Sequence, residues 1–260
     1  MTTIAKVKVP LLGVRVSPLR RDELLRHIQE AVLGDRRLIV AGHNLHSVYL
    51  WHQLPELRDF YHRAGAVIID GMPVLALLRF APSVRTGGVG RAAGASRWST
   101  EHRLGSTDWV DGLVELDAVT RVTTLGGTPE AADAALKHFS SLSRRVVWQT
   151  IPADPWQAAE LDAVCDRIRR HAPQILLIGM GMPLQERLAV ELSQRLDVPV
   201  IATVGGALDQ LGGVQSLAPR WLGSWGLEWA WRLASDPRRL AGRYLLEPPK
   251  LAALLLRRDR

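Results

Sequence analysis

The chain has 260 residues, 47% of them hydrophobic, and a formal net charge of +7 at pH 7. This length and composition predict one large domain, or one domain with an appendage, and exclude global disorder. The only cysteine, Cys165, excludes a disulfide framework and a cysteine-rich metal site. The positive charge favours an anionic partner, such as a nucleotide, a nucleic acid or a membrane surface.

The N-terminus has no apolar run long enough for a signal peptide. No stretch of the chain reaches the roughly 20 apolar residues of a membrane span. We therefore expect the protein to be made and kept in the cytoplasm.

The first half of the chain predicts alternating elements. Alternation around a Pro-Leu-Leu-Gly turn indicates a small hairpin over Val7–Val16. The apolar spacing of the next segment predicts an amphipathic helix over Ser17–Leu33, with Ser17 as a candidate cap. A strand over Arg37–Ala41, a helix over His46–Tyr61 and a strand over Ala66–Ile69 follow.

A segment rich in Gly, Ser, Arg and Thr, Pro82–Thr107, interrupts this rhythm, and we expect a long mobile loop there. The regular pattern then returns. The expected elements are helices over Thr107–Leu116, Glu130–Ser140, Pro155–His171 and Leu188–Leu196, and strands over Val119–Leu125, Arg145–Thr150, Ile175–Ile178 and Pro199–Val204.

Strands that alternate with helices predict an α/β fold, with a mainly parallel, Rossmann-like sheet flanked by helices. Most of the strands run into polar or glycine-rich loops, at Asn44, Asp70, Gly126–Gly127, Gly179–Gly181 and Gly205–Asp209. Because parallel strands bring their carboxyl ends to one edge of the sheet, we expect the site along that edge.

The stretch Ile175–Glu186 is the most informative one. Four apolar residues lead into Gly179-x-Gly181-x-Pro183, which indicates a buried strand, a tight loop and a helix start with free N–H groups for an anion. The third glycine of a dinucleotide fingerprint is missing, and so are a P-loop, a Gly-x-Ser-x-Gly elbow and an Asp-x-Asp pair. The histidines form no zinc pair, so we expect no metal.

Asp70 stands at the end of a strand in an Asp-Gly turn. A lone aspartate in this position can act as a general base for a hydroxyl, or it can simply form the turn. The residue alone leaves both readings open.

The C-terminal region, 216–260, differs from the rest in composition and predicts a helical appendage to an α/β catalytic domain over 1–215. It contains Trp221, Trp225, Trp229, Trp231, Arg232, Arg238, Arg239, Arg243, Lys250, Arg257, Arg258, Arg260 and the run Leu251–Leu256. Such a segment is typical of helices that lie on an anionic membrane. The alternative is a helix pair that packs its tryptophans into the core.

Short motifs occur in a characteristic order along the chain. They are Asn44, Ile68-Ile69-Asp70-Gly71, Arg103-x-Gly105-x-x-Asp108, Leu125-Gly126-Gly127-x-Pro129, Gly179-x-Gly181-x-Pro183-x-Gln185-Glu186, Val204-Gly205-Gly206-x-x-Asp209, Ala218-Pro219-x-Trp221, Gly226-Leu227-Glu228-Trp229 and Pro237-x-Arg239. In the order and spacing of these motifs the chain resembles the WecG/TagA/CpsF glycosyltransferase family from the hairpin to Tyr244.

The resemblance implies an inverting, metal-independent transfer from a UDP-sugar to an undecaprenyl-diphosphate-linked saccharide, at the inner face of the plasma membrane, in cell-surface polysaccharide synthesis. It requires no cofactor besides the donor. Asp70 matches the family's base and Arg103 the arginine at the departing diphosphate. The matched substrate-binding residues are Asn44, Gln185, Gly126, Gly127, Gly181, Gly206 and Asp209; Arg232, Arg238, Arg239 and Arg243 match the residues that meet membrane and diphosphate.

The chain departs from the family in two places. Gly42 stands where the family often has threonine, which leaves the donor sugar open. The segment between Asp70 and Arg103 is longer than usual, and we expect its arginines, Arg79, Arg85, Arg91 and Arg97, to lie in solvent.

Two other functions fit parts of the sequence. A non-catalytic nucleic-acid-binding protein would fit the positive charge, but the aromatic residues cluster with leucines instead of alternating with basic residues. An NAD(P)-dependent oxidoreductase rests on Gly-x-Gly alone. The sequence leaves the oligomeric state open, a homo-oligomer included.

Overall fold

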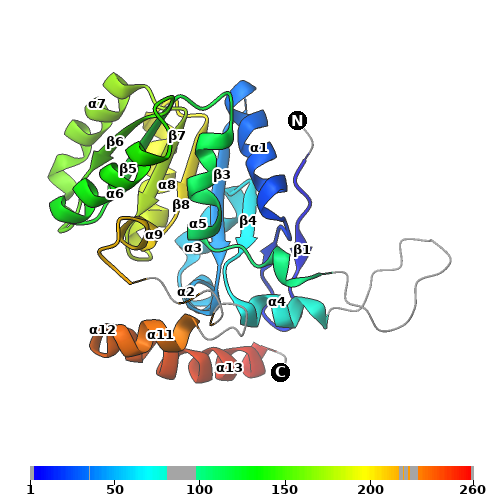
Figure 1. The fold of residues 1–260 in the computed structure, drawn as a ribbon. Helices are drawn as coiled ribbons and strands as arrows, with labels where there is room; N and C mark the ends of the chain where they lie inside the picture. The colour runs from blue at the N-terminus through cyan, green and yellow to red at the C-terminus, as the bar shows by residue number, and fades with distance from the viewer. Residues whose placement is uncertain are drawn as a thin grey trace.

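A computed structural model of the protein describes residues 3–34, 36–80, 98–216, 219, 222 and 228–258. Among these residues, parallel strands form one sheet in the order β4-β3-β8-β7-β5-β6, beside an antiparallel hairpin of β1 and β2. Helices cover both faces of the larger sheet (Figure 1). The predicted α/β class with a mainly parallel sheet is confirmed.

The elements have the following bounds. The strands are β1 Val7–Lys8, β2 Arg15–Val16, β3 Leu38–His43, β4 Ala66–Ile69, β5 Arg121–Gly126, β6 Val147–Ile151, β7 Ile175–Gly179 and β8 Val200–Thr203. The α-helices are α1 Arg21–Leu33, α2 Leu45–Gln53, α3 Pro55–Arg63, α4 Met72–Arg79, α5 Ser106–Trp109, α6 Pro129–Leu142, α7 Leu161–His171, α8 Leu184–Arg195, α9 Ala207–Leu211, α11 Glu228–Ser235, α12 Pro237–Ala241 and α13 Glu247–Arg258. Short 3-10 turns span Thr100–His102, Val110–Glu115 and Ala158–Glu160, and a π-helical turn, Gly242–Leu246, joins α12 to α13.

The two faces of the sheet bury separate apolar clusters. In β7, Ile175 and Leu177 belong to the cluster beneath α1, α5 and α6, whereas Leu176 and Ile178 belong to the cluster beneath α3, α4 and α8. Successive side chains of a strand point to opposite faces, so a strand covered on both faces is apolar throughout. This explains why the uninterrupted apolar run of β7 forms a central strand.

Several expected boundaries were wrong. The helix predicted from Ser17 begins at Arg21, and the Ser17 hydroxyl instead accepts a hydrogen bond from the Val67 amide at 3.3 Å. The helix predicted over His46–Tyr61 breaks before Pro55, which cannot donate the backbone hydrogen bond that a continuous helix needs.

Two helices were not predicted, and the expected loop is partly ordered. Helix α4 follows the Asp70 turn, and α9 follows β8. Of the segment predicted as a mobile loop, residues 82–97 lie outside the described part, while Thr100–His102 and the start of α5 are helical.

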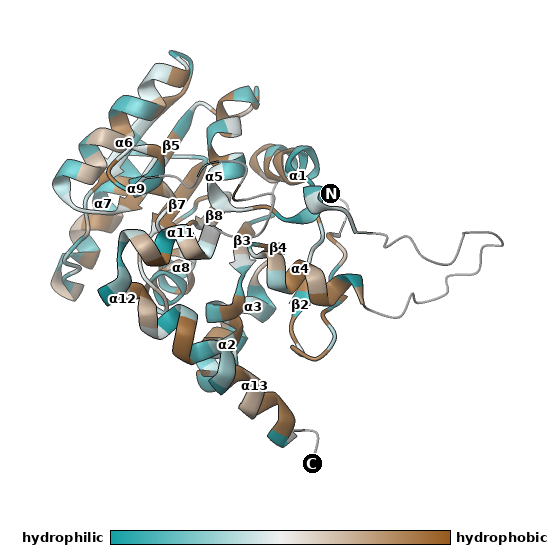
Figure 2. Cartoon of the chain, turned by 60° about the horizontal axis from the view of Figure 1, so that its bottom comes forward, coloured by the Kyte–Doolittle hydropathy of each residue, from teal (hydrophilic) through white to brown (hydrophobic). Residues whose placement is uncertain are grey.

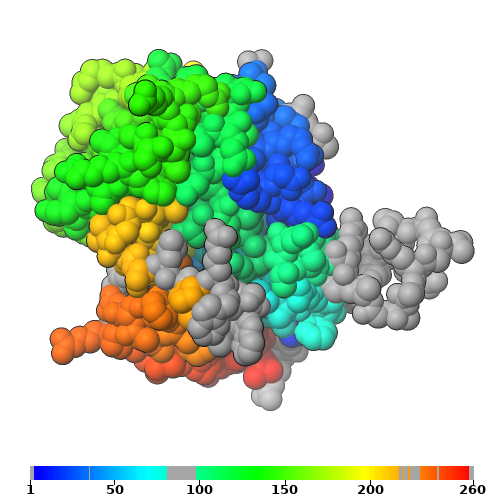
Figure 3. All heavy atoms as spheres, viewed as in Figure 1, coloured from blue at the N-terminus to red at the C-terminus, as the bar shows by residue number. Residues whose placement is uncertain are grey.

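The C-terminal helices α11, α12 and α13 lie across the carboxyl edge of the sheet (Figure 1). Figure 3 shows the atoms of this segment, coloured orange to red, along one side of the molecule. Leu251 of α13 is buried in the same cluster as Val9 and Leu12 of the hairpin. Trp229 remains 42% exposed, and Trp221 and Trp225 lie outside the described residues. The C-terminal segment therefore packs on the α/β unit through part of its apolar surface.

Candidate active site

A cavity of about 920 Å³ lies between the carboxyl edge of the sheet and the C-terminal helices. It is lined by the loops after β3, β4, β7 and β8 and by residues of α11 and the π-helical turn. The sequence predicted this edge of the sheet. Among the predicted residues, those that line the cavity are Asn44, Asp70, Arg103, Gly127, Gly181, Gln185, Gly206, Asp209, Arg232 and Arg243.

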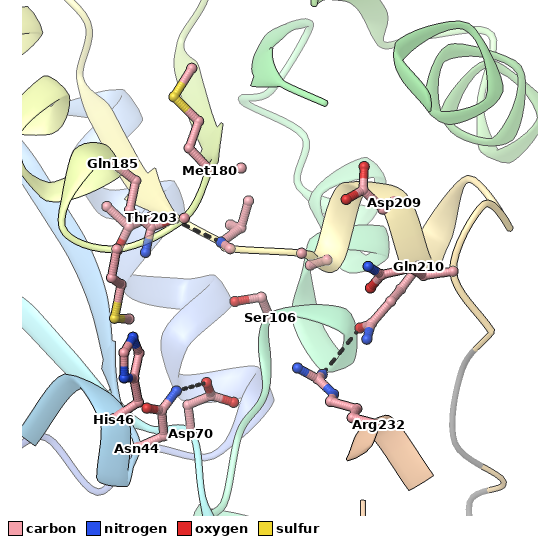
Figure 4. A pocket seen from close by; sticks show the side chains of 18 of the residues that line it. Asn44, His46, Asp70, Ser106, Met180, Gln185, Thr203, Asp209, Gln210 and Arg232 are labelled. Atoms are coloured by element: carbon pink, nitrogen blue, oxygen red, sulfur yellow. Dashed lines mark hydrogen bonds between the residues drawn. The ribbon is translucent and has the colours of Figure 1, made fainter. Parts of the chain in front are cut away.

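Asp70 and Asn44 form the polar centre of one end of the cavity (Figure 4). Asn44 is the N-cap of α2, and its Oδ1 atom accepts a hydrogen bond from the Ser47 amide at 3.0 Å. This bond directs the Nδ2 group of Asn44 away from the helix. The Nδ2 group donates a hydrogen bond to Oδ2 of Asp70 at 3.1 Å. The cap thus orients the amide, and the amide orients the carboxylate.

Opposing effects act on the Asp70 carboxyl group. Burial raises its pKa above the ordinary value, and this effect is the largest. The positive charge of Arg232, the hydrogen bond from Asn44, and the charges of Arg243 and Arg103 all oppose it. The net effect is a raised pKa, in a desolvated carboxyl group that feels the positive charge of arginines from three separate segments.

Arg103 reaches the site because the chain returns to β4 after a long excursion. The Leu104 amide donates to the Ile69 carbonyl at 2.8 Å, so Arg103 pairs with Ile69, next to Asp70. The Oδ2 atom of Asp108 accepts a hydrogen bond from the Gly105 amide at 2.7 Å and lies 3.6 Å from Arg103 Nη2. Backbone pairing with Ile69 and the Asp108 carboxylate thus fix the position of Arg103, which the sequence pattern placed only at the end of a predicted loop.

Two glycines allow the chain to approach Asp70 closely. A Cβ atom at Gly105 would lie 3.4 Å from Asp70 Oδ1, and one at Gly42 would lie 3.1 Å from Asp70 Cβ. A side chain at residue 42 would therefore press directly on the aspartate. Gly42 lines the cavity, so the site is open where the family often carries threonine.

Gln185 is held on both sides of its amide. Its Oε1 accepts from the Gly205 amide at 3.0 Å, and its Nε2 donates to Glu186 Oε1 at 2.7 Å. Both side chains are buried, and burial raises the pKa of Glu186 to about 7. Gln185 thus ties the start of α8 to the loop after β8.

The glycine-rich loops form the other end of the cavity, where Figure 4 shows Asp209 far from Asp70. A Cβ atom at Gly127 would lie 3.1 Å from Asp209 Oδ1. Gly126 does not line the cavity: its φ is 141°, and a Cβ there would lie 2.1 Å from the Gly179 carbonyl oxygen. Its role is close packing of β5 against β7.

The C-terminal segment contributes cations to the cavity. Arg232 of α11 donates to Gln210 Oε1 at 3.3 Å, and Arg243 lies on the π-helical turn. Arg238 is exposed on α12 and does not line the cavity. Arg239 is on the same helix, but its side chain lies outside the described part.

One pair in the cavity had no signal in the sequence. His46 Nδ1 and Glu247 Oε2 lie 2.5 Å apart and join α2 to α13. The two residues are separated by 201 positions, so no local motif could have revealed the contact.

The described residues contain neither a cluster of metal-ligating side chains nor a helix that could span a membrane. Within 3–34, 36–80, 98–216 and 228–258, no three His, Cys, Asp or Glu side chains are grouped so that they could hold a metal ion. Every helix of the described chain is too short or too polar to cross a bilayer.

Three proteins of Staphylococcus aureus, from strains MW2, NCTC 8325 and COL, are similar to part of the chain. Each is named N-acetylglucosaminyldiphosphoundecaprenol N-acetyl-beta-D-mannosaminyltransferase and is 25% identical over 155 residues. The match covers 59% of this chain and 60% of each relative. The model of the glycosyl transferase WecG/TagA/CpsF family matches far more, residues 9–260, and the protein therefore belongs to this family.

Proposed function

We propose that this glycosyltransferase moves a sugar from a UDP-sugar to a saccharide linked to undecaprenyl diphosphate, with inversion at the anomeric carbon. The names of the relatives support an acceptor of this class, because each name describes an acceptor in which N-acetylglucosamine is linked through a diphosphate to undecaprenol. Cell-surface polysaccharide assembly is the corresponding process.

The Asp70 carboxylate carries the mechanism. It takes the proton of the acceptor hydroxyl while that oxygen forms a bond to the anomeric carbon, and the bond from this carbon to the UDP oxygen breaks. A single displacement of this kind inverts the configuration. The surroundings support the role: Asp70 is desolvated, oriented by Asn44 and placed in a cavity of about 920 Å³.

The arginines supply the charge that a departing diphosphate needs. Arg103, Arg232 and Arg243 all act electrostatically on Asp70, so they lie near the reacting centre. Guanidinium groups are permanently charged and bind phosphate oxygens in a fork, which stabilises charge that develops on the leaving group. We propose that this cluster replaces a metal ion and that no cofactor is required.

Membrane docking through the C-terminal helices completes the proposal, with the protein on the inner face of the plasma membrane. Lys250 and Arg257 are exposed on α13, next to exposed leucines of the same segment. A basic and apolar surface of this kind suits an anionic bilayer.

The decisive experiment is the transfer reaction with Asp70→Asn. Radiolabelled UDP-sugars are screened with a synthetic polyprenyl-diphosphate-linked sugar, and the variant is compared under the best conditions. We expect kcat to fall by about 10²- to 10⁴-fold, because the amide cannot take the proton, while UDP still binds in calorimetry. Asp111→Asn, outside the cavity, is the matched control. Near-normal turnover of Asp70→Asn would remove Asp70 from the mechanism.

A further inference from the structure

The His46–Glu247 pair is built into the cavity wall. His46 lies in the first turn of α2, two residues after Asn44, and Glu247 is the first residue of α13. Their side chains are only 17% and 20% exposed, and both residues line the cavity. A short hydrogen bond between two largely buried groups fixes the orientation of the imidazole ring.

The pairing also fixes which ring nitrogen is protonated. An ionised carboxylate only accepts hydrogen bonds, so the Nδ1 atom of His46 carries a proton and donates it to Glu247. Burial and the charge of Arg243 lower the pKa of His46 by more than Glu247 raises it, which keeps the ring neutral near pH 7. Its Nε2 atom then offers a lone pair, and no described residue occupies it.

The position of the ring indicates which substrate it meets. Figure 4 shows His46 beside Asn44 and Asp70, far from Asp209 at the glycine-rich end. Glu247 of the C-terminal segment, which the proposal above places at the membrane, lines the cavity at His46. A lipid-linked acceptor enters from that side.

The chemistry of the pair selects the group that binds. A neutral nitrogen with a carboxylate behind it repels phosphate oxygens and attracts an O–H donor. The arginines nearby serve the diphosphate. We propose that His46, held by Glu247, accepts a hydrogen bond through Nε2 from a hydroxyl of the acceptor sugar, which makes His46 a specificity-determining residue. This inference rests on the proposed function and adds a contact to it.

Two substitutions separate substrate binding from a purely structural contact. His46→Asn keeps an amide near the Nδ1 position, within reach of Glu247, but removes the Nε2 acceptor. His46→Gln places an amide near the Nε2 position instead. We expect His46→Asn to raise KM for the acceptor about three- to tenfold, the worth of one neutral hydrogen bond. The KM for the UDP-sugar changes less than twofold, and His46→Gln recovers part of the loss.

The chain offers a matched control. His138 forms a similar pair with Asp111, at 2.9 Å, outside the cavity. We expect His138→Asn to leave both KM values unchanged. Thermal melts of the variants check that the fold is retained. Nitrogen-15 NMR of the wild type reads the tautomer directly, and a proton on Nδ1 is expected.

The outcomes distinguish the two levels of the proposal. An active His46→Asn enzyme with an unchanged acceptor KM overturns this inference alone. A rise in the donor KM instead of the acceptor KM, or a neutral ring protonated on Nε2, overturns it as well. A wild-type enzyme that uses no UDP-sugar overturns the proposed function, and this inference with it.

Discussion

In the proposed mechanism Asp70 is the base, and its neighbours set the strength of that base. Burial makes its proton harder to lose, and three arginines and an asparagine make it easier. A permanently ionised aspartate on the surface would be a weak base, whereas a desolvated one holds the proton of an attacking hydroxyl more firmly. In the proposed mechanism the arginines therefore have two effects: they stabilise the leaving group, and they lower the pKa of the base.

We predict that Arg232→Gln moves the acid limb of the pH–rate profile upward. Arg232 is the strongest of the charges that lower the pKa of Asp70, so its removal raises that pKa further. The base is lost when Asp70 is protonated, so activity should then begin to fall at a higher pH than in the wild type. The measurement is kcat/KM across the acid range. As a control, Arg238→Gln, on the exposed face of α12, should leave the acid limb where it lies in the wild type. An acid limb in Arg232→Gln identical to that of the wild type would contradict the assignment of this limb to Asp70.

The catalytic centre was only partly predictable from single residues. Asp70 and Asn44 follow directly after strands, so the rule that parallel strands end at one edge places them together. Arg103 follows a long segment without periodicity, and only its backbone pairing with Ile69 fixes it. The His46–Glu247 contact depends on how α13 packs against α2, which no local pattern encodes.

At the scale of elements, the start of α8 is held by two buried polar residues. Gln185 joins it to the loop after β8, and Glu186 holds the Gln185 amide in turn. The Oε2 atom of Glu186 is buried and has no hydrogen-bond partner among the described residues. The arrangement positions a cavity loop at a cost in stability that depends on the charge of Glu186.

We predict that Glu186→Gln removes part of the pH dependence of stability. The native pKa is about 7 and the ordinary value is 4.5, so between these pH values the native state keeps a proton that the unfolded chain releases. The free energy of unfolding of the wild type therefore falls as the pH rises through this window. Glutamine does not ionise, so the variant should gain on the order of 1 to 3 kcal/mol relative to the wild type between pH 5 and pH 8. Urea denaturation at both pH values measures this. Parallel pH curves for the two proteins would contradict the burial argument.

The elements themselves show where sequence patterns succeed. Strand β4 has the predicted bounds, Ala66–Ile69. An apolar run this short between polar turns is too short for a helix and therefore indicates a buried strand. Helix α4 was missed because Gly71 and Pro73 indicate a turn, although proline is also accepted in the first turn of a helix. Local signals at such positions are ambiguous, and packing of Val74, Leu75 and Leu78 decides in favour of the helix.

At the scale of the whole molecule, the surface of the C-terminal helices combines exposed leucines with basic residues. Figure 2 shows brown and teal residues together along the C-terminal helices, which cross the carboxyl edge of the sheet. Leu245, Leu246 and Leu256 are 55%, 57% and 72% exposed there. Leu251 is buried on the opposite side of α13, so the helix presents one apolar side to the core and leaves other leucines outside.

This surface lies next to the cavity that contains Asp70. In the proposed reaction a polyprenyl chain stays in the bilayer while its diphosphate and sugar reach Asp70, so we propose that the membrane contact lies at this edge of the protein. Membership of the glycosyltransferase family also makes the nucleic-acid and dinucleotide hypotheses unnecessary. In the proposal the positive charge instead serves binding to a surface of anionic lipids.

We predict that Leu245→Glu combined with Leu246→Glu weakens binding to anionic vesicles by at least about tenfold. Burial of one leucine in an apolar medium is worth roughly 1.5 to 3 kcal/mol, and the new carboxylates also repel the lipid charge. Co-sedimentation with vesicles of phosphatidylglycerol and phosphatidylcholine measures the loss. The matched control is Leu33→Glu: Leu33 is 72% exposed and ends α1 just before β3 begins, at the opposite edge of the sheet. Equal binding by the two variants would show that the C-terminal segment is not the docking surface, whereas loss in the double variant alone would place the bilayer beside the cavity.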